Sequence, residues 1–165
     1  MKNILITGGT GYIGSHTCIP LLERNYKLTI VDSNINSSPR SIERLKNLLK
    51  NRSFENKISF IKGDIRNGLF LKKIFKKAFL DNNPIEGVIH FAGLKSVSES
   101  FANPLIYWEN NVLGSIRLLE IMKEYDCKKI VFSSSATIYG NQSIQPILEN
   151  SSIKPISPYA YTKAS

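Results

Sequence analysis

The chain has 165 residues, of which 42% are hydrophobic, so it is long enough to bury a core and too apolar to be disordered. No apolar run is long enough to span a bilayer, and glycines follow the first strand before a signal-peptide core could form. We therefore expect a cytoplasmic protein without membrane contacts. The net charge of +9 comes mainly from scattered lysines, which does not favour a nucleic-acid partner. The densest group, Lys72, Lys73, Lys76 and Lys77, is typical of a solvated helix face.

The two cysteines, Cys18 and Cys127, have neither a CxxC partner nor the spacing of metal ligands. We expect both to be reduced thiols. The sequence predicts no metal site.

Apolar runs alternate with amphipathic segments from one end of the chain to the other. Strands are predicted over residues 3–7, 27–32, 57–62, 87–92 and 129–134, and helices over 12–25, 41–52, 69–81 and 104–125. Strands that alternate with helices indicate an α/β fold with a doubly wound parallel sheet, the Rossmann type. Pro20 and Gly114 fall inside predicted helices, where each is unfavourable.

The first predicted strand runs directly into the segment Thr-Gly-Gly-Thr-Gly-Tyr-Ile-Gly at 7–14, which opens the first helix. Glycines allow a tight turn and let phosphates approach the backbone, while the helix N-terminus offers free N–H groups. Because this strand–turn–helix context is what the mechanism requires, we predict that the loop binds the pyrophosphate of a dinucleotide. The alternative is a glycine-rich turn without a ligand.

Carboxylates follow the second and third predicted strands. Asp32 lies about twenty residues beyond the glycine loop, where a carboxylate accepts hydrogen bonds from a ribose and repels a 2′-phosphate. This position favours NAD over NADP, and the alternative is an aspartate that only caps a loop. Asp64 follows the third strand, beside the expected adenine edge of the sheet.

The spacing Tyr159-x-x-x-Lys163 places both side chains on one face of a helix. The same spacing at Tyr125-x-x-x-Lys129 straddles a predicted helix end and strand start, so those side chains need not share a face. Ser135 follows the last predicted strand, and ligands bind at the carboxyl ends of such strands. A neighbouring ammonium favours a phenolate, so Tyr159 is a candidate base and Ser135 a candidate hydrogen-bond donor to the same oxygen.

Together these segments resemble the extended branch of the short-chain dehydrogenase/reductase superfamily, and within it the family of UDP-glucose 4-epimerases. The resemblance rests on residues 7–17, 63–66, 88–100, 110–112, 131–140 and 158–163. Residues 134–136 read Ser-Ser-Ala, where the related nucleotide-sugar dehydratases typically have Thr-Asp-Glu.

The resemblance, with the glycine loop, implies a set of NAD-binding residues that spans the chain. They are Gly8, Gly11, Tyr12, Ile13 and Gly14 at the loop; Asp32, Ser33, Asn34, Ile35, Asn36 and Ser37 at the adenosine ribose; Asp64 and Ile65 at the adenine; and Phe91, Ala92, Gly93, Leu94, Lys95 and Asn110 at the nicotinamide half. It implies that Ser135, Tyr159 and Lys163 are catalytic and also border the cofactor, with Ser135 and Tyr159 contacting the sugar. His90 is interpreted as a packed core residue, and His16 as more suited to packing than to catalysis.

The resemblance further implies the activity. Members of the family interconvert UDP-glucose and UDP-galactose at C4 through a 4-keto intermediate in galactose metabolism, with NAD as cofactor and a UDP-hexose as substrate. They dimerise through a four-helix bundle formed by the helix at 104–125 and the Tyr–Lys helix, so Tyr107, Trp108, Leu113, Ile116 and Leu119 supply apolar surface to the core or to this interface. Open alternatives are another nucleotide-sugar epimerase or dehydratase, and a non-catalytic NAD-binding module.

Family members continue beyond the Tyr–Lys helix with a further strand and a smaller domain that grips UDP and the sugar. We therefore expect residues 1–165 to form an incomplete NAD-binding Rossmann domain, with the C-terminal nucleotide-sugar domain absent. On this interpretation the chain alone is inactive as an epimerase.

Overall fold

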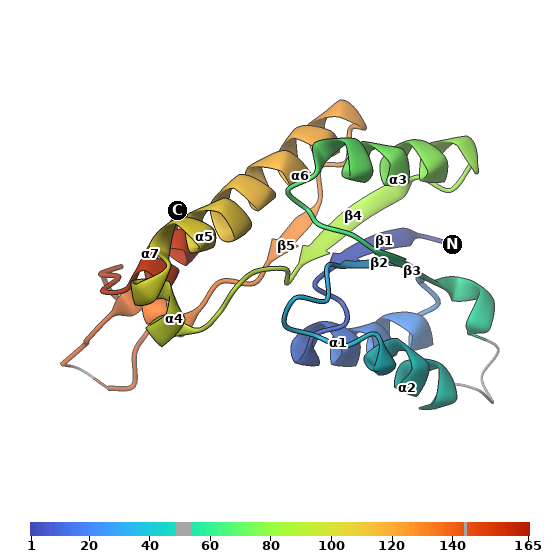
Figure 1. Ribbon diagram of the computed structural model, residues 1–165. Coiled ribbons are helices and arrows are strands. Elements are labelled where there is room, and N and C mark those ends of the chain that lie inside the picture. The colour runs from blue at the N-terminus through green and yellow to red at the C-terminus, as the bar shows by residue number, and fades with distance from the viewer. Residues whose placement is uncertain (49–53, 144) are drawn as a thin grey trace.

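A parallel five-stranded sheet forms the centre of the fold, in a computed structural model that describes residues 1–48, 54–143 and 145–165. Its strands are β1 (Asn3–Thr7), β2 (Lys27–Asp32), β3 (Ile58–Lys62), β4 (Ile85–His90) and β5 (Ile130–Phe132). They lie in the order β3-β2-β1-β4-β5, so the strand order reverses between β1 and β4 (Figure 1). The predicted doubly wound Rossmann sheet is confirmed, and a ligand is expected at this reversal.

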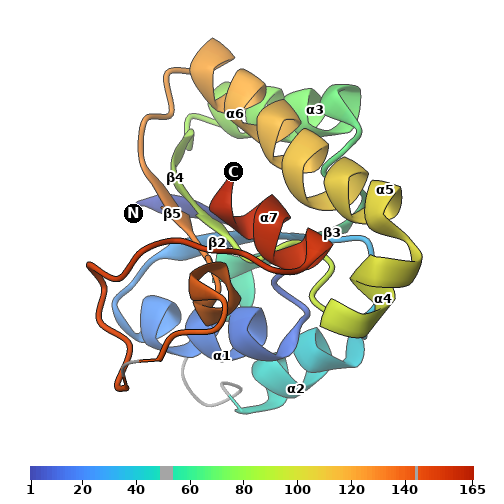
Figure 2. The same ribbon diagram turned by 90° about the vertical axis from the view of Figure 1, so that its left-hand side faces the viewer.

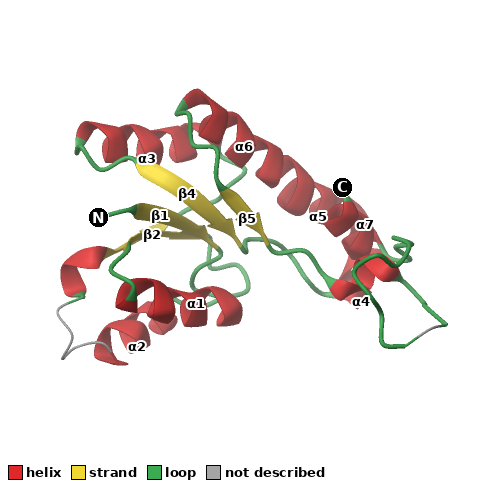
Figure 3. Ribbon diagram, turned by 180° about the vertical axis from the view of Figure 1, so that it is seen from behind, coloured by secondary structure: helices red, strands yellow, loops and turns green. Residues whose placement is uncertain are grey.

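Helices cover both faces of the sheet. α1 (Tyr12–Glu23) and α2 (Arg40–Leu48) lie on one face, and α3 (Gly68–Leu80) and α6 (Gly114–Glu124) lie on the other (Figures 1 and 3). Because successive strand residues point to opposite faces, Leu5 packs into the core under α3 and α6, whereas Ile6 packs under α1 and α2. No described helix is long and apolar enough to cross a membrane.

Several predicted boundaries differ from the observed ones. α1 and α3 end before asparagines with positive φ, Asn25 at 65° and Asn82 at 52°, which stop the helices slightly earlier than predicted. β4 begins and ends two residues before its predicted bounds, and β5 is three residues long, because residues 91–92 and 133–134 turn out of the sheet at its carboxyl edge. The predicted helix over 41–52 is observed as α2, and residues 49–53 lie outside the described residues.

The single helix predicted over 104–125 is wrong in its interior. It consists of α5 (Pro104–Tyr107), a π-helical turn η3 (Trp108–Leu113) and α6. α6 begins at Gly114, where a Cβ would lie 2.8 Å from Cδ1 of Ile65. Glycine at this position therefore allows the helix to approach the loop after β3 closely. Pro20 lies inside α1, three residues before that helix ends.

Two short helices, α4 (Val97–Ala102) and α7 (Pro158–Ala164), lie near the carboxyl edge of the sheet. α4 was not predicted, although Ser96 accepts a hydrogen bond from the Glu99 amide at 3.3 Å, the arrangement that a Ser-x-x-Glu sequence favours. α7 packs against α4 and α5 beyond the strand ends (Figure 2). The 3₁₀ turns η2 (Glu55–Lys57) and η4 (Ala136–Tyr139) lie before β3 and after β5.

Candidate functional site

A cleft of about 490 Å³ opens at the carboxyl edge of the sheet. Of the predicted site residues, all but Asn34 line it: Gly8, Gly11, Tyr12, Ile13, Gly14, Asp32, Ser33, Ile35, Asn36, Ser37, Asp64, Ile65, Phe91, Ala92, Gly93, Leu94, Lys95, Asn110, Ser135, Tyr159 and Lys163. Thr10, Val31, Gly63, Ser133 and Ser134 also line it and were not predicted. The fold therefore brings residues from seven separate segments around one cavity.

The glycine loop has the backbone that close phosphate approach requires. Gly8 has a φ of 71°, and a Cβ there would lie 2.5 Å from the Ala92 amide nitrogen, so only glycine fits against the end of β4. α1 begins at Tyr12 without a side-chain cap and without an acidic residue in its first turn. Its first N–H groups have no intrahelical acceptor and border the cleft, an arrangement that suits a bound anion.

Asp32 is only 7% exposed and joins the glycine loop to the loop after β2. Its Oδ2 accepts a hydrogen bond from the Thr10 amide at 3.0 Å, and its Oδ1 accepts from the Asn34 amide at 2.9 Å and the Ser37 hydroxyl at 2.8 Å. A carboxylate has about four acceptor positions, so one remains for a ligand. Asp32 thus caps a loop and lines the cleft at once.

Asn34, predicted at the cofactor, is not among the residues that line the cleft. Its Nδ2 donates to the Thr10 hydroxyl at 2.8 Å and to the Ser37 hydroxyl at 3.2 Å. The residue adopts a φ of 59°, which turns the loop after β2 back toward the glycine loop. Its contacts therefore hold the loop after β2 against the glycine loop.

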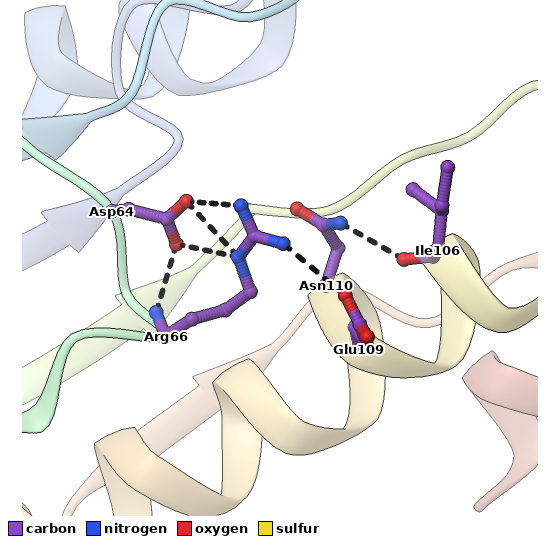
Figure 4. A network of polar contacts seen from close by, with 5 residues as sticks. All are labelled: Asp64, Arg66, Ile106, Glu109 and Asn110. Atoms are coloured by element: carbon purple, nitrogen blue, oxygen red, sulfur yellow. Dashed lines mark hydrogen bonds and ion pairs between the residues drawn. The ribbon is translucent and has the colours of Figure 1, made fainter.

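Asp64 lines the cleft after β3 and forms an ion pair with Arg66 (Figure 4). Arg66 donates from Nη2 to Asp64 Oδ2 at 2.7 Å and from Nε to both carboxylate oxygens, while its Nη1 lies 3.6 Å from Oε2 of Glu109. The hydrogen bonds from Arg66 hold the pKa of the Asp64 carboxyl below its ordinary value. Arg66 was not predicted. Its contact with Glu109 joins the loop after β3 to the π-helical turn η3, two segments that are far apart in the sequence.

The loop after β4 is fastened by Asn111, a residue that the sequence did not single out. Asn111 is 3% exposed; it accepts from the Leu94 amide at 2.8 Å and donates to the Leu94 carbonyl at 3.0 Å and the Thr162 hydroxyl at 2.9 Å. The predicted Asn110 lines the cleft, and its amide donates to the Ile106 carbonyl at 2.8 Å (Figure 4). Both asparagines lie in the π-helical turn, where helical periodicity does not tell which one faces inward.

Tyr159 and Lys163 lie one turn apart on α7 and are each 8% exposed. The Lys163 ammonium donates to the Ser133 carbonyl at 3.0 Å and lies 4.7 Å from the centre of the Phe132 ring. Burial lowers the pKa of Lys163. The Tyr159 ring packs edge-on against Tyr107, with centroids 6.3 Å apart. The pair is therefore held by the protein and borders the cleft.

Ser135 caps the 3₁₀ turn η4 at the end of β5. Its hydroxyl oxygen accepts from the Thr137 amide at 3.3 Å and lies 2.9 Å from the Thr137 hydroxyl. Ser135 thus lines the same cleft as Tyr159 and Lys163.

The two histidines have different surroundings. His90 is 1% exposed, with Nδ1 2.6 Å from the Thr7 hydroxyl and Nε2 2.8 Å from the Ser115 hydroxyl, which confirms its prediction as a packed residue. Burial, together with the Lys163 charge, lowers the pKa of His90 to about 4. His16 is exposed instead of packed in the core, and its ring lies 4.5 Å from that of Tyr12.

Cys18 and Cys127 are both free and buried.

Comparison with known proteins gives the relatives of this chain. It is 47% identical to UDP-glucose 4-epimerase 2 of Arabidopsis thaliana over 98% of this chain and 44% of that protein, and 43% identical to the UDP-glucose 4-epimerase of Bacillus subtilis over 97% and 44%. The crystal structure of the Stenotrophomonas maltophila UDP-glucose-4-epimerase with bound NAD and formylated UDP-arabinopyranose superposes with a TM-score of 0.89 at 39% identity, covering 99% of this chain and 46% of that one. The chain thus spans less than half the length of these relatives. Residues 5–165 match the family described as GDP-mannose 4,6 dehydratase, and the chain belongs to that family.

Proposed function

We propose that this chain forms the NAD-binding part of a UDP-glucose 4-epimerase. The observation that carries the proposal is the shared cleft, in which Tyr159, Lys163 and Ser135 face the same space as the glycine loop and Asp32. The bacterial relative from Stenotrophomonas maltophila has NAD in its structure, and the relatives are epimerases by name. Because the chain spans 44% of the plant relative, we expect activity from a polypeptide of the relatives' full length and not from these 165 residues alone.

The lining residues fit NAD in an extended conformation. The uncapped start of α1 suits the pyrophosphate, and the free acceptor position of Asp32 suits a ribose hydroxyl. In this proposal Asp64 and Ile65, which line the cleft, would hold the adenine, and residues 91–95 and Asn110 would hold the nicotinamide. When bound, NAD supplies the acceptor and donor of the hydride at C4 of the sugar.

The residues of α7 and η4 provide the proton chemistry in this proposal. Tyr159 takes the proton of the sugar 4-hydroxyl and later returns it, and the Lys163 ammonium stabilises the phenolate. Ser135 donates a hydrogen bond to the same sugar oxygen and so orients C4 toward the nicotinamide side of the cleft.

A dehydratase is the competing function, and its chemistry needs an acid that protonates the departing hydroxyl. The strand end that borders the cleft carries Ser133, Ser134 and Ser135 and then Ala136, without a carboxylate. This favours epimerisation. Product analysis with UDP-galactose distinguishes the two: an epimerase yields an isomer of unchanged mass, whereas a product lighter by one water would contradict the proposal.

Asp32 is expected to set the preference for NAD over NADP. Asp32→Asn keeps the shape and one acceptor oxygen but removes the charge that repels a 2′-phosphate, so the NAD:NADP affinity ratio should fall by about tenfold, or roughly 1.4 kcal/mol. Isothermal titration with each dinucleotide measures the ratio, with Asp81→Asn on the surface as control. Binding of NADP by the unaltered protein as tightly as NAD would disprove this role.

The helix from α5 to α6 presents an apolar face that supports a homodimer. Tyr107 is fully buried, whereas Trp108, Leu113, Ile116 and Leu119 are 40–48% exposed. The alternative in which all five side chains face the sheet is therefore wrong. We propose that the exposed four pack against a second copy.

Ile116→Glu is expected to convert the full-length dimer to monomers, because a charge would be buried at the interface. Sedimentation at micromolar concentration measures the state. Leu69→Glu, at an apolar side chain 75% exposed on α3, is the matched control and should leave the dimer intact. A monomeric unaltered protein would rule out the interface.

A further inference from the structure

A second hollow of about 550 Å³ lies between α1 and α2 and adjoins the cleft at residues 10–12. Its lining combines polar, cationic and apolar side chains. It is lined by Thr10, Gly11, Tyr12, Ser15, His16, Ile19, Ser38, Arg40, Ser41, Arg44, Leu45 and Leu48. The proposed function does not use this hollow.

The charge in the hollow is positive and uncompensated. Arg40 and Arg44 lie one turn apart on α2, where two like charges repel each other. Within the described part of the chain, neither guanidinium makes an ion pair or a hydrogen bond, and no acidic residue lines the hollow. The two arginines therefore have ten guanidinium N–H donors between them, five for each, available to a ligand.

The walls of the hollow are fixed in place by the protein. The Ser41 hydroxyl donates to the Thr10 carbonyl at 3.0 Å, which ties the start of α2 to the glycine loop. The rings of Tyr12 and His16 lie 4.5 Å apart on α1, and Leu45 of α2, which is 2% exposed, also lines the hollow. The helix that carries the two arginines is thus tied to the glycine loop near its N-terminus.

We propose that this hollow binds a phosphoryl anion beside the dinucleotide, held by Arg40 and Arg44. Guanidinium groups match the oxygens of a phosphoryl group in pairs, and the hydroxyl of Ser38, which accepts from the Arg40 amide, can donate a further hydrogen bond. We assign a separate ligand in preference to the 2′-phosphate of a dinucleotide, because the Asp32 carboxylate stands on the ribose side and repels a phosphate there.

The test titrates inorganic phosphate into this chain after saturation with NAD, at constant ionic strength, so that the glycine loop is already filled. The chain has two histidines, so the ring resonances of His16 report on the hollow while those of buried His90 serve as the reference. We expect a saturable shift of His16. Arg40→Gln with Arg44→Gln should weaken phosphate binding by about tenfold or more. Lys73→Gln with Lys76→Gln removes the same charge from α3 and should leave binding unchanged.

Three outcomes would overturn the proposal: a shift that does not saturate, a shift that the arginine variant retains, and an equal loss in the lysine control. A parallel titration with NADP in place of NAD separates the two sources of phosphate. If bound NADP prevents inorganic phosphate from binding, the 2′-phosphate occupies the hollow and a separate ligand is excluded. Binding of NAD is measured independently, so failure at this site leaves the proposed function untouched.

Discussion

Tyr159→Phe is expected to reduce epimerisation of UDP-galactose by about a hundred- to ten-thousand-fold, the contribution of a positioned acid–base group. Phenylalanine keeps the ring that packs edge-on against Tyr107 and removes only the phenolic oxygen. NAD affinity should therefore stay close to that of the unaltered protein. The measurement is a coupled assay on a polypeptide of the relatives' full length that carries this chain, with NAD binding titrated in parallel.

Tyr161→Phe is the matched control for this experiment. Tyr161 lies on the same helix, is 52% exposed and does not line the cleft, so its hydroxyl has no place in the reaction. Turnover by Tyr159→Phe at the level of this control would show that Tyr159 is not the base. A parallel loss of NAD binding would instead assign its hydroxyl to holding the cofactor.

Stability is expected to fall as the pH drops from 6.5 toward 4, because His90 must stay neutral in the folded state. The pKa of His90 is about 4 in the folded chain, against an ordinary value of 6.5 for histidine, so the unfolded chain binds the extra proton across this window. The free energy of unfolding therefore rises with pH there, and about 3 kcal/mol is lost on acidification below the folded pKa. The imidazole is buried between the Thr7 and Ser115 hydroxyls, and its burial, together with the nearby Lys163 charge, disfavours the protonated form.

His90→Gln tests this expectation through pH dependence and not through absolute stability. The variant has no imidazole at this position, so the difference in unfolding free energy between it and the unaltered protein should shrink as the pH falls from 6.5 to 4. His16→Gln, at an exposed ring, should keep the slope of the unaltered protein. Parallel curves for the unaltered protein and His90→Gln would contradict the assignment of this titration to His90.

Much of the fold was predictable because local patterns and tertiary structure agree. β1 and β2 have the predicted bounds, since both are central strands buried on both faces, whose continuous apolar runs end at Gly8 and beyond Asp32. The second pair with this spacing, Tyr125 and Lys129, lies between the end of α6 and the start of β5, as predicted. Of the two pairs, only Tyr159 and Lys163 therefore share a helix.

The features that the sequence did not predict depend on contacts between distant segments. The π-helical turn changes which of Asn110 and Asn111 faces inward, and a 3.6-residue period contains no signal for it. Arg66 lies 3.6 Å from Glu109 where the start of α6, at Gly114, approaches Ile65 in the loop after β3. The assignment of Tyr107 to the core likewise required the packing of α5 against α7.

Calorimetric titration of this chain with NAD tests the central claim, that the cleft is a dinucleotide site, most directly. Gly11 lines the cleft with only the Gly8 carbonyl near its missing Cβ, so Gly11→Val fills the place of the pyrophosphate without a clash in the core. Gly68→Val, at an open position at the start of α3, is the control. We expect saturable binding of one NAD to the unaltered chain and to Gly68→Val, and its loss in Gly11→Val. No saturable binding to the unaltered chain, or equal binding to Gly11→Val, would contradict it.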